Sequence, residues 1–258
     1  MSGIPAFSLH ATPESVARWR IGRDGAVAPP PKEGEPLPLS YLVFLRVQPI
    51  LGVSIHRLLD RDPDRGLYGG VSYRAERPPR VGEMFVAAST VSSRREVPTP
   101  RGTLVLRTLD TGYRNAGSTV VTESVRMVDL PEGPPQAPAS GPRRQPAMAK
   151  VADVGPFTRN QVAWLTVETG DTNALHLDAA YAASRLFPDV VVPGTLTAAA
   201  LERELSRVLG RALRALDLRL HAASFPGQAF TLHAQATADG LAYELYRGDE
   251  LMAEGGAA

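Results

Sequence analysis

An acidic and an imidazole side chain, Asp171 and His176, lie close together in one stretch of the sequence. Gly170 precedes the acid and Asn173 lies between the two residues, and both types favour a short turn. Such a turn allows a carboxylate and an imidazole to reach the same water molecule, which general acid and base catalysis requires. The spacing therefore predicts a catalytic pair.

Two other interpretations of this pair are open. In the first, Asp171 only caps a turn and His176 is a hydrogen-bonded core residue. In the second, both side chains bind a metal ion, but no third Cys, His or acidic residue follows at ligand spacing, so we predict no metal site. Structural or surface roles are expected for the other histidines, which are scattered along the chain: His10, His56, His221 and His233.

A long amphipathic pattern follows the pair. Pro193 and Gly194 precede it, and apolar residues gather on one face of a helix expected from Thr195 to Leu209. Asp178 is the expected cap of a shorter helix from Tyr181 to Leu186. The predicted catalytic turn therefore lies close in sequence to the start of the main helix.

Composition bounds the class of protein. A chain of 258 residues with 43% hydrophobic residues is long enough to bury a substantial core. It contains no cysteine, which excludes disulfides, thiolate zinc sites and cysteine nucleophiles, and indicates a cytoplasmic setting. The net charge of +1 is spread along the chain, so we expect no nucleic-acid partner, and no apolar run predicts a membrane span.

The order of structural signals repeats in the two halves of the chain. Each half reads as a short helix, a loop, a main helix and then antiparallel strands, an α+β arrangement of helix packed on sheet. Thr158 to Ala163 matches Thr12 to Ala17, and Gly227 to Phe230 matches Gly82 to Phe85. The first short helix is expected to stop at Gly22, and the first main helix to span 39–59, interrupted by Pro49 and Gly52 and closed like the second at a Leu-Gly pair.

Short runs rich in Val, Thr and aromatic residues predict the strands. They span 70–75, 84–92, 103–111 and 119–128 in the first half, and 218–224, 230–237, 241–247 and 250–254 in the second. Residues 131–146 are rich in proline and lack apolar periodicity, which indicates an extended linker. We therefore divide the chain into an N-terminal repeat (1–130), a Pro-rich linker (131–150) and a C-terminal repeat (151–258).

The stretch around the pair resembles a known family. The residues Gly170-Asp171-x-Asn173-x-Leu175-His176-x-Asp178, followed by Tyr181-Ala182, Phe187 and Val191-Val192-Pro193-Gly194, are similar to the MaoC-like dehydratases and (R)-specific enoyl-CoA hydratases. The first half resembles the partner repeat of double hot-dog members through Gly69-Gly70-Val71-x-Tyr73 and Arg77-Pro78-x-x-Val81-Gly82-Glu83. The fold implied is a double hot-dog, in which a curved antiparallel sheet wraps a central helix in each half.

The resemblance also implies a reaction and a site. Asp171 and His176 activate one water for syn addition to a 2-enoyl thioester, or remove water from an (R)-3-hydroxyacyl thioester. The amide of Gly194 binds the thioester carbonyl, in agreement with the positive end of a helix as an oxyanion donor. Asn173 and Gly170 shape the catalytic turn. No cofactor is implied, because coenzyme A or the pantetheine of a carrier protein is part of the substrate.

Three positions depart from the family pattern. Ala174 stands where proline is common in the family. Pro193 stands where histidine often precedes the glycine, and we expect this proline to narrow the mouth of the acyl pocket. In the first half, Asp24 lies at roughly the position of the catalytic acid, but no histidine follows it before Pro29. We therefore expect one active site per chain, with a degenerate N-terminal repeat that acts as scaffold and pocket wall.

Two other functions remain open. One is a dehydratase or cyclising enzyme that acts on carrier-protein-bound intermediates of polyketide or other specialised biosynthesis. The other is a non-catalytic partner subunit that binds an acyl thioester, although the intact Asp171 and His176 argue against it. The expected partner is an acyl-CoA or acyl-carrier-protein thioester from fatty acid or polyketide metabolism, and a homodimer of double hot-dogs is the expected assembly.

Overall fold

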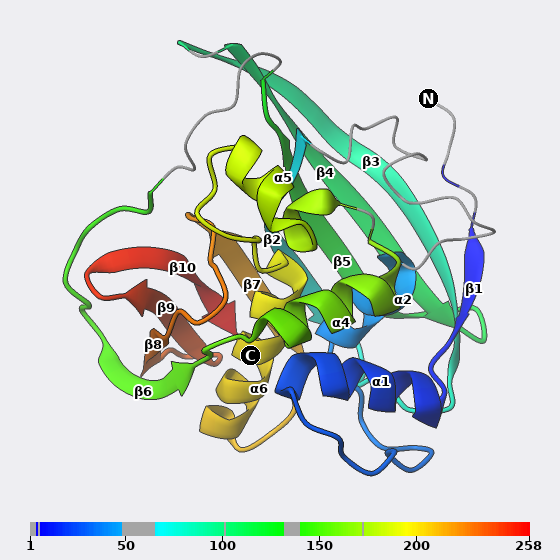
Figure 1. The fold of residues 1–258 in the computed structure, drawn as a ribbon. Helices are drawn as coiled ribbons and strands as arrows, with labels where there is room; N and C mark the ends of the chain where they lie inside the picture. Colours follow the sequence, from blue (N-terminus) through cyan, green and yellow to red (C-terminus); the bar gives the residue numbers. More distant parts are fainter. Residues whose placement is uncertain (1–3, 5, 48–64, 101, 132–139, 172) are drawn as a thin grey trace.

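The computed structural model describes residues 4, 6–47, 65–100, 102–131, 140–171 and 173–258 (Figure 1). Its framework is one ten-stranded antiparallel sheet in the order β1-β3-β4-β5-β2-β7-β10-β9-β8-β6. The strands of the first half are β1 (Phe7–His10), β2 (Gly66–Ala75), β3 (Met84–Thr99), β4 (Gly102–Asn115) and β5 (Ser118–Asp129). Those of the second half are β6 (Ala149–Val154), β7 (Ala215–Leu220), β8 (Phe230–Ala236), β9 (Leu241–Arg247) and β10 (Glu250–Ala257).

The strand order is symmetric about the junction of β2 and β7. Outward from that junction, the first half has the order β2, β5, β4, β3 and β1. The second half has the corresponding order β7, β10, β9, β8 and β6. The two halves join by direct pairing of Gly70–Arg74 with Ala215–Arg219. The repeat inferred from sequence is therefore a structural repeat, and backbone hydrogen bonds close the seam between its halves.

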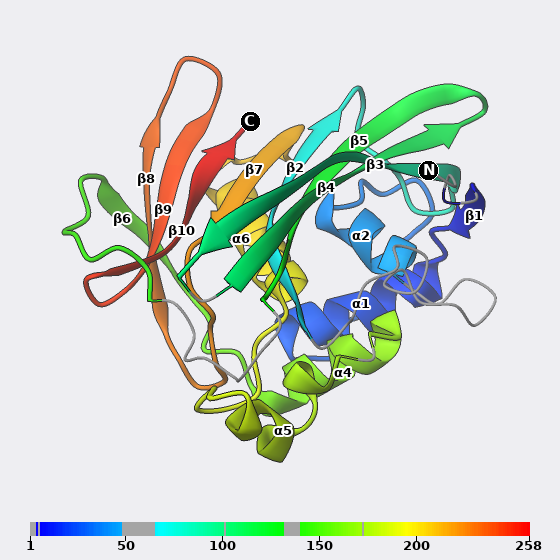
Figure 2. The same ribbon diagram turned by 90° about the horizontal axis from the view of Figure 1, so that it is seen from above.

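The helices of the described residues lie on one face of the curved sheet (Figures 1 and 2). They are α1 (Pro13–Asp24), α2 (Ser40–Val47), α4 (Arg159–Thr169), α5 (Ala179–Ser184) and α6 (Gly194–Leu209), with a 3₁₀ turn, η2 (Ala174–His176). The central helix α6 contacts α2, α1 and the strands β2, β6 and β7. Figure 2 shows α6 and α2 next to the sheet, with α1, α4 and α5 farther from it.

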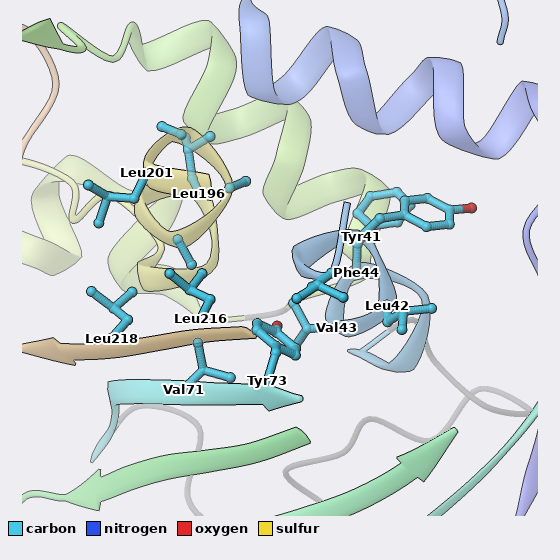
Figure 3. Packing of buried hydrophobic residues seen from close by; sticks show 14 of the residues in the cluster. Tyr41, Leu42, Val43, Phe44, Val71, Tyr73, Leu196, Leu201, Leu216 and Leu218 are labelled. Carbon is cyan, nitrogen blue, oxygen red and sulfur yellow. The ribbon is translucent and has the colours of Figure 1, made fainter. Parts of the chain in front are cut away.

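The cores of the two halves are continuous. Leu196 and Leu201 of α6 belong to the same buried cluster as Leu216 and Leu218 of β7 and Val71 of the neighbouring strand β2 (Figure 3). Aromatic side chains of α2 fill the core of the first half. Tyr41 stacks on Phe44 and packs edge to face against Trp19 of α1. Burial of these side chains holds both central helices against one sheet.

A buried carboxylate ties α6 to α2. Glu202 of α6 accepts hydrogen bonds from the amides of Leu39 and Ser40, at 2.6 and 2.8 Å, and from the Ser40 hydroxyl. These donors lie at the N-terminus of α2, where amides have no partner within the helix. Burial raises the pKa of Glu202, an effect that the three donors oppose. The carboxylate therefore caps the central helix of one half from the central helix of the other.

Helix caps confirm most predicted starts and correct one end. Thr12 and Thr158 cap α1 and α4 through their side chains, as their matching sequence patterns predicted. The predicted stop at Gly22 is wrong, because α1 continues to Asp24 and ends at Gly25, which has φ 69°. A left-handed residue ends a helix, and Gly25 adopts that conformation without steric penalty.

Other elements differ in length from the prediction. The main helix of the first half begins at Ser40, one residue inside the predicted range, and is described only to Val47. Pro49, Gly52 and the predicted Leu-Gly ending lie outside the described residues. β3 and β4 run to Thr99 and Asn115, beyond their predicted ends, while β7 stops at Leu220 although a strand to Ser224 was predicted.

The sheet also has two edge strands that the sequence pattern did not predict. β1 pairs with β3, and β6 pairs with β8, at opposite ends of the sheet. Ala149 and Lys150, placed in the linker from sequence, belong to β6. Part of the linker that precedes β6 lies along β10. The amide of Leu251 donates to the Pro142 carbonyl, and the backbone of Arg143 forms an isolated antiparallel β-bridge with Glu250. The division into domains remains a prediction.

Candidate active site

The C-terminus of α4 presents Asp171. The helix begins with a capping box of Thr158 and Gln161 and ends at Gly170, whose φ of 64° is left-handed. Because glycine adopts this conformation readily, the chain turns sharply and the amide of Asp171 returns to the carbonyl of Thr166 at 3.0 Å. The carboxylate is thereby fixed immediately beyond the helix, with its side chain 25% exposed.

Asn173 shapes the turn between the acid and the imidazole. Its backbone amide donates to Oδ1 of Asp171 at 2.9 Å, and its buried side-chain Oδ1 accepts from the amide of Leu175 at 3.0 Å. The side chain thus caps η2, the 3₁₀ turn that carries His176. One residue therefore orients the carboxylate through its main chain and starts the imidazole's turn through its side chain.

The backbone of Val191 sets the tautomer of His176. Nδ1 of the imidazole lies 2.7 Å from the carbonyl oxygen of Val191. A carbonyl only accepts, so Nδ1 carries the hydrogen and Nε2 of the neutral ring has a free lone pair. The amide of Val191 in turn donates to the carbonyl of Leu175 at 2.8 Å. The turn that carries His176 and the segment before α6 thus hold each other in place.

The acid and the base face each other across a gap that suits water. Nε2 of His176 lies 3.7 Å from Oδ2 of Asp171, too far for a direct hydrogen bond. A water about 2.8 Å from both atoms completes a triangle with that separation. Because Nδ1 of His176 and Oδ1 of Asp171 already have partners, Nε2 and Oδ2 are the atoms that remain to bind a water in this gap.

Gly194 opens α6 three residues after Val191. Its amide has no acceptor within the helix, because the first amides of any helix lack one. Pro193 is the N-cap residue and makes no side-chain capping bond. Three residues span at most about 11 Å, so the amide lies within reach of the same small ligand as His176. Positive helix-end potential is therefore placed beside the acid and base pair.

A small apolar cluster lies next to the turn that carries His176. Leu175, Ala182, Phe187, Val191 and Phe225 form its buried part, and Leu67, Tyr181 and Ala223 pack against it. The rings of Phe187 and Phe225 are 6.4 Å apart. Asp178 caps α5 by accepting from the amides of Ala180 and Tyr181, as predicted. Through Leu175 and Val191, the turn of His176 is thus anchored in a buried apolar cluster.

The described part of the first half shows no second acid and imidazole pair. Gly25 and Gly170 are the left-handed C-caps of α1 and α4, and Asp171 follows its glycine whereas Asp24 is the last residue of α1 and precedes Gly25. Asp24 instead pairs with Arg23 and Arg203 at 2.6 and 2.9 Å. Among the described residues, no group of three His, Cys, Asp or Glu side chains is arranged to hold a metal ion.

Sequence patterns identified the turn and its two titratable residues but missed two components. The Val191 carbonyl is a backbone group, and its selection depends on which segments meet in three dimensions. Tyr68 of β2 lies against Gly194 from the other half of the chain. The Gly69-Gly70 pair that follows Tyr68 is the one local signal of an irregular strand there.

The C-terminal half, with this pair and helix, matches a known family model. Residues 140–240 match the model described as the MaoC like domain. These residues are therefore similar to a MaoC-like domain. The matched range includes Asp171, His176 and Gly194, whereas the N-terminal repeat lies outside it. A comparison with curated proteins finds no match. Within the described residues, no helix combines the length and the apolar character that a membrane span requires.

Solved structures show the fold of the whole chain. HtdX from Mycobacterium tuberculosis is 18% identical with a TM-score of 0.71, over 98% of this chain and 99% of HtdX. A MaoC-like dehydratase from Phytophthora capsici is 17% identical with a TM-score of 0.72, over 99% of this chain and 95% of its own. Rv0216 from Mycobacterium tuberculosis, described as a double hot-dog, is 14% identical with a TM-score of 0.63, over 100% and 96%. The fold is a double hot-dog, as the sequence resemblance implied.

Proposed function

We propose that this MaoC-like protein is a hydro-lyase that adds water to a 2-enoyl thioester or removes it from an (R)-3-hydroxyacyl thioester. The observation that carries the proposal is the 3.7 Å gap between Nε2 of His176 and Oδ2 of Asp171, whose other polar atoms are already engaged. A water held there has an acceptor on each side. The family match of residues 140–240 supports the same reaction class.

The geometry assigns a role to each group. As the oxygen of water bonds to C3 of the enoyl group, the pair removes one proton from the water. Electrons of the C2–C3 double bond move toward the thioester carbonyl, and the Gly194 amide stabilises the developing enolate at the N-terminus of α6. The pair then returns one proton to C2, so that both side chains end in their starting protonation states.

Two substitutions test this proposal. Asp171→Asn and His176→Ala should each lower the rate of hydration of 2-butenoyl-CoA by about 10²–10⁴-fold, because each removes a proton-transfer group. Loss of absorbance of the conjugated thioester measures the rate, and circular dichroism with thermal unfolding checks that each variant is folded. Full activity in either folded variant contradicts the assignment.

The same assay separates the other candidate functions. Faster turnover of carrier-protein thioesters than of coenzyme A thioesters favours the role in specialised biosynthesis. Binding of a thioester without turnover favours the acyl-binding partner subunit. Release of free thiol indicates hydrolysis of the thioester bond, and a thiol reagent detects it; one structural neighbour, from Lactobacillus plantarum, is described as a putative oleoyl thioesterase.

A further inference from the structure

The aromatic ring of Tyr68 lies directly against the proposed carbonyl-binding residue. A Cβ atom built on Gly194 would be 2.5 Å from Cδ1 of Tyr68 and 3.0 Å from its Cγ. The same position would be 2.9 Å from Cδ1 of Leu220. Tyr68 belongs to β2 of the N-terminal repeat, whereas Gly194 opens the central helix of the C-terminal repeat. The degenerate half therefore supplies a side chain to the proposed site.

A β-bulge aims this ring inward. Val71 and Tyr73 of β2 are buried in the core, so strict alternation would place residue 69 inward and Tyr68 outward. The register of β2 against β5 shifts between Tyr68 and Gly70, and Tyr68 pairs with Met127, a buried core residue. Paired residues share a face of the sheet, so the extra residue turns Tyr68 to the inner face.

The exposed part of Tyr68 is not its hydroxyl group. The residue is partly exposed, yet its hydroxyl oxygen is buried. The accessible atoms therefore belong to the rest of the residue, which includes the ring beside Gly194. The preceding residue, Leu67, packs against the apolar cluster beneath the catalytic turn. This end of β2 thus contacts both Gly194 and the apolar cluster next to the turn of His176.

We infer that Tyr68 is a specificity-determining residue that excludes substituents at C2 of the acyl group. The inference rests on the proposed function. A thioester with its carbonyl oxygen on the Gly194 amide places a C2 substituent within about 5 Å of that amide nitrogen, by standard bond and hydrogen-bond lengths. The ring of Tyr68 already occupies space at this residue. The substrate class is therefore 2-enoyl or 3-hydroxyacyl thioesters that are unbranched at C2.

The test compares two thioesters that differ by one methyl group. Hydration of 2-butenoyl-CoA and 2-methyl-2-butenoyl-CoA is measured with the wild type, Tyr68→Ala and Tyr68→Phe. One methyl group at a filled wall is discriminated by roughly 10–200-fold. We expect Tyr68→Ala to lower the preference for the unbranched substrate by about tenfold, and Tyr68→Phe to keep the wild-type preference, because it retains the ring. Comparing the preference of each variant with that of the wild type cancels the intrinsic difference in reactivity between the two substrates.

A preference in folded Tyr68→Ala within twofold of the wild type overturns the inference. Tyr68→Leu replaces the alanine variant if the latter does not fold, since leucine removes the planar ring and keeps apolar volume. A second readout is independent of turnover: calorimetric binding of butanoyl-CoA and 2-methylbutanoyl-CoA to the same variants.

These readouts separate the two proposals. A wild type that binds both saturated thioesters without hydrating either enoyl thioester contradicts the proposed function, and the ratio of dissociation constants then tests Tyr68 alone. A wild type that hydrates both enoyl thioesters with no preference that Tyr68→Ala changes contradicts the inference alone. Failure to bind either saturated thioester also overturns the inference.

Discussion

Nδ1 of His176 lies 2.7 Å from the carbonyl oxygen of Val191, which fixes the tautomer and leaves Nε2 toward Asp171. The same contact anchors η2, so in the proposed reaction the anchoring and the proton transfer belong to different nitrogen atoms. Asparagine retains a donor near the position of Nδ1 but has no counterpart of Nε2. This pair of properties allows the two roles to be separated in one variant.

We predict that His176→Asn keeps its fold and loses catalysis. Its free energy of unfolding should stay within about 1 kcal/mol of the wild type, because the donor to Val191 remains. Hydration of 2-butenoyl-CoA should fall by about 10²–10⁴-fold, because the base is absent. Urea unfolding and the absorbance assay measure the two quantities. His176→Ala is the matched control that loses both groups, and activity above a tenth of wild type in His176→Asn contradicts the assignment of Nε2.

Asn173→Ala should affect both stability and rate. The substitution leaves the buried amide of Leu175 without the Asn173 acceptor, which costs about 1–2 kcal/mol and loosens the turn that carries His176. We expect kcat to fall by about tenfold, since displacement of a positioned base slows proton transfer. Asp178→Ala is the matched control: it removes the cap of α5 and leaves the turn of Asn173 intact. Equal effects of both variants on kcat contradict a positioning role for Asn173.

Gly70→Ala should weaken the seam between the halves. A Cβ atom on Gly70 would be 2.1 Å from the carbonyl oxygen of Leu218 across the β2–β7 junction, and Gly70 has φ 140°. We expect the free energy of unfolding to fall by about 3 kcal/mol or more, from a steric clash combined with backbone strain. Gly117→Ala is the control, because Gly117 also has positive φ, 83°, but no atom lies within 4 Å of its Cβ position. Similar losses in both variants would show that strain alone matters.

Glu202→Ala should uncouple the two central helices. Two amides at the start of α2 and the Ser40 hydroxyl lose their acceptor in a buried environment, which costs about 3 kcal/mol or more. Arg207→Ala, on the same helix, removes a mostly exposed side chain and should cost less than about 1 kcal/mol. Denaturant unfolding measures both. A loss below 1 kcal/mol in Glu202→Ala contradicts the role of this carboxylate as a cap between the halves.

The stability of the wild type should also carry a pH signature of Glu202. Burial raises the pKa of this carboxyl above its ordinary value of 4.5, so the folded state binds a proton more readily than the unfolded state. The free energy of unfolding therefore falls as the pH rises from about 4.5 through the raised pKa. Glu202→Gln has no such proton, so its stability relative to the wild type should rise over that range. A difference that is independent of pH contradicts this linkage.

Local signals in the sequence predicted much of the fold. These signals act within a few residues of the chain. They include the capping threonines of α1 and α4, the turn glycines and the apolar face of α6, and the helices form where these signals predict them. The edge strands β1 and β6 were missed because short strands depend on the partner that they meet, here β3 and β8. The end of α1 was misplaced because two glycines were available, and only the packed helix determines which one becomes left-handed.

For the site, the sequence alone determined the residue types and the turn: Gly170, Asp171, Asn173 and His176 act at short range, where chain geometry leaves few alternatives. The tertiary structure decided which atoms have partners. It placed the Val191 carbonyl on Nδ1 and brought Tyr68 across the seam to Gly194. These relationships join segments far apart in sequence, and they depend on strand register and on a bulge that no single stretch of residues specifies.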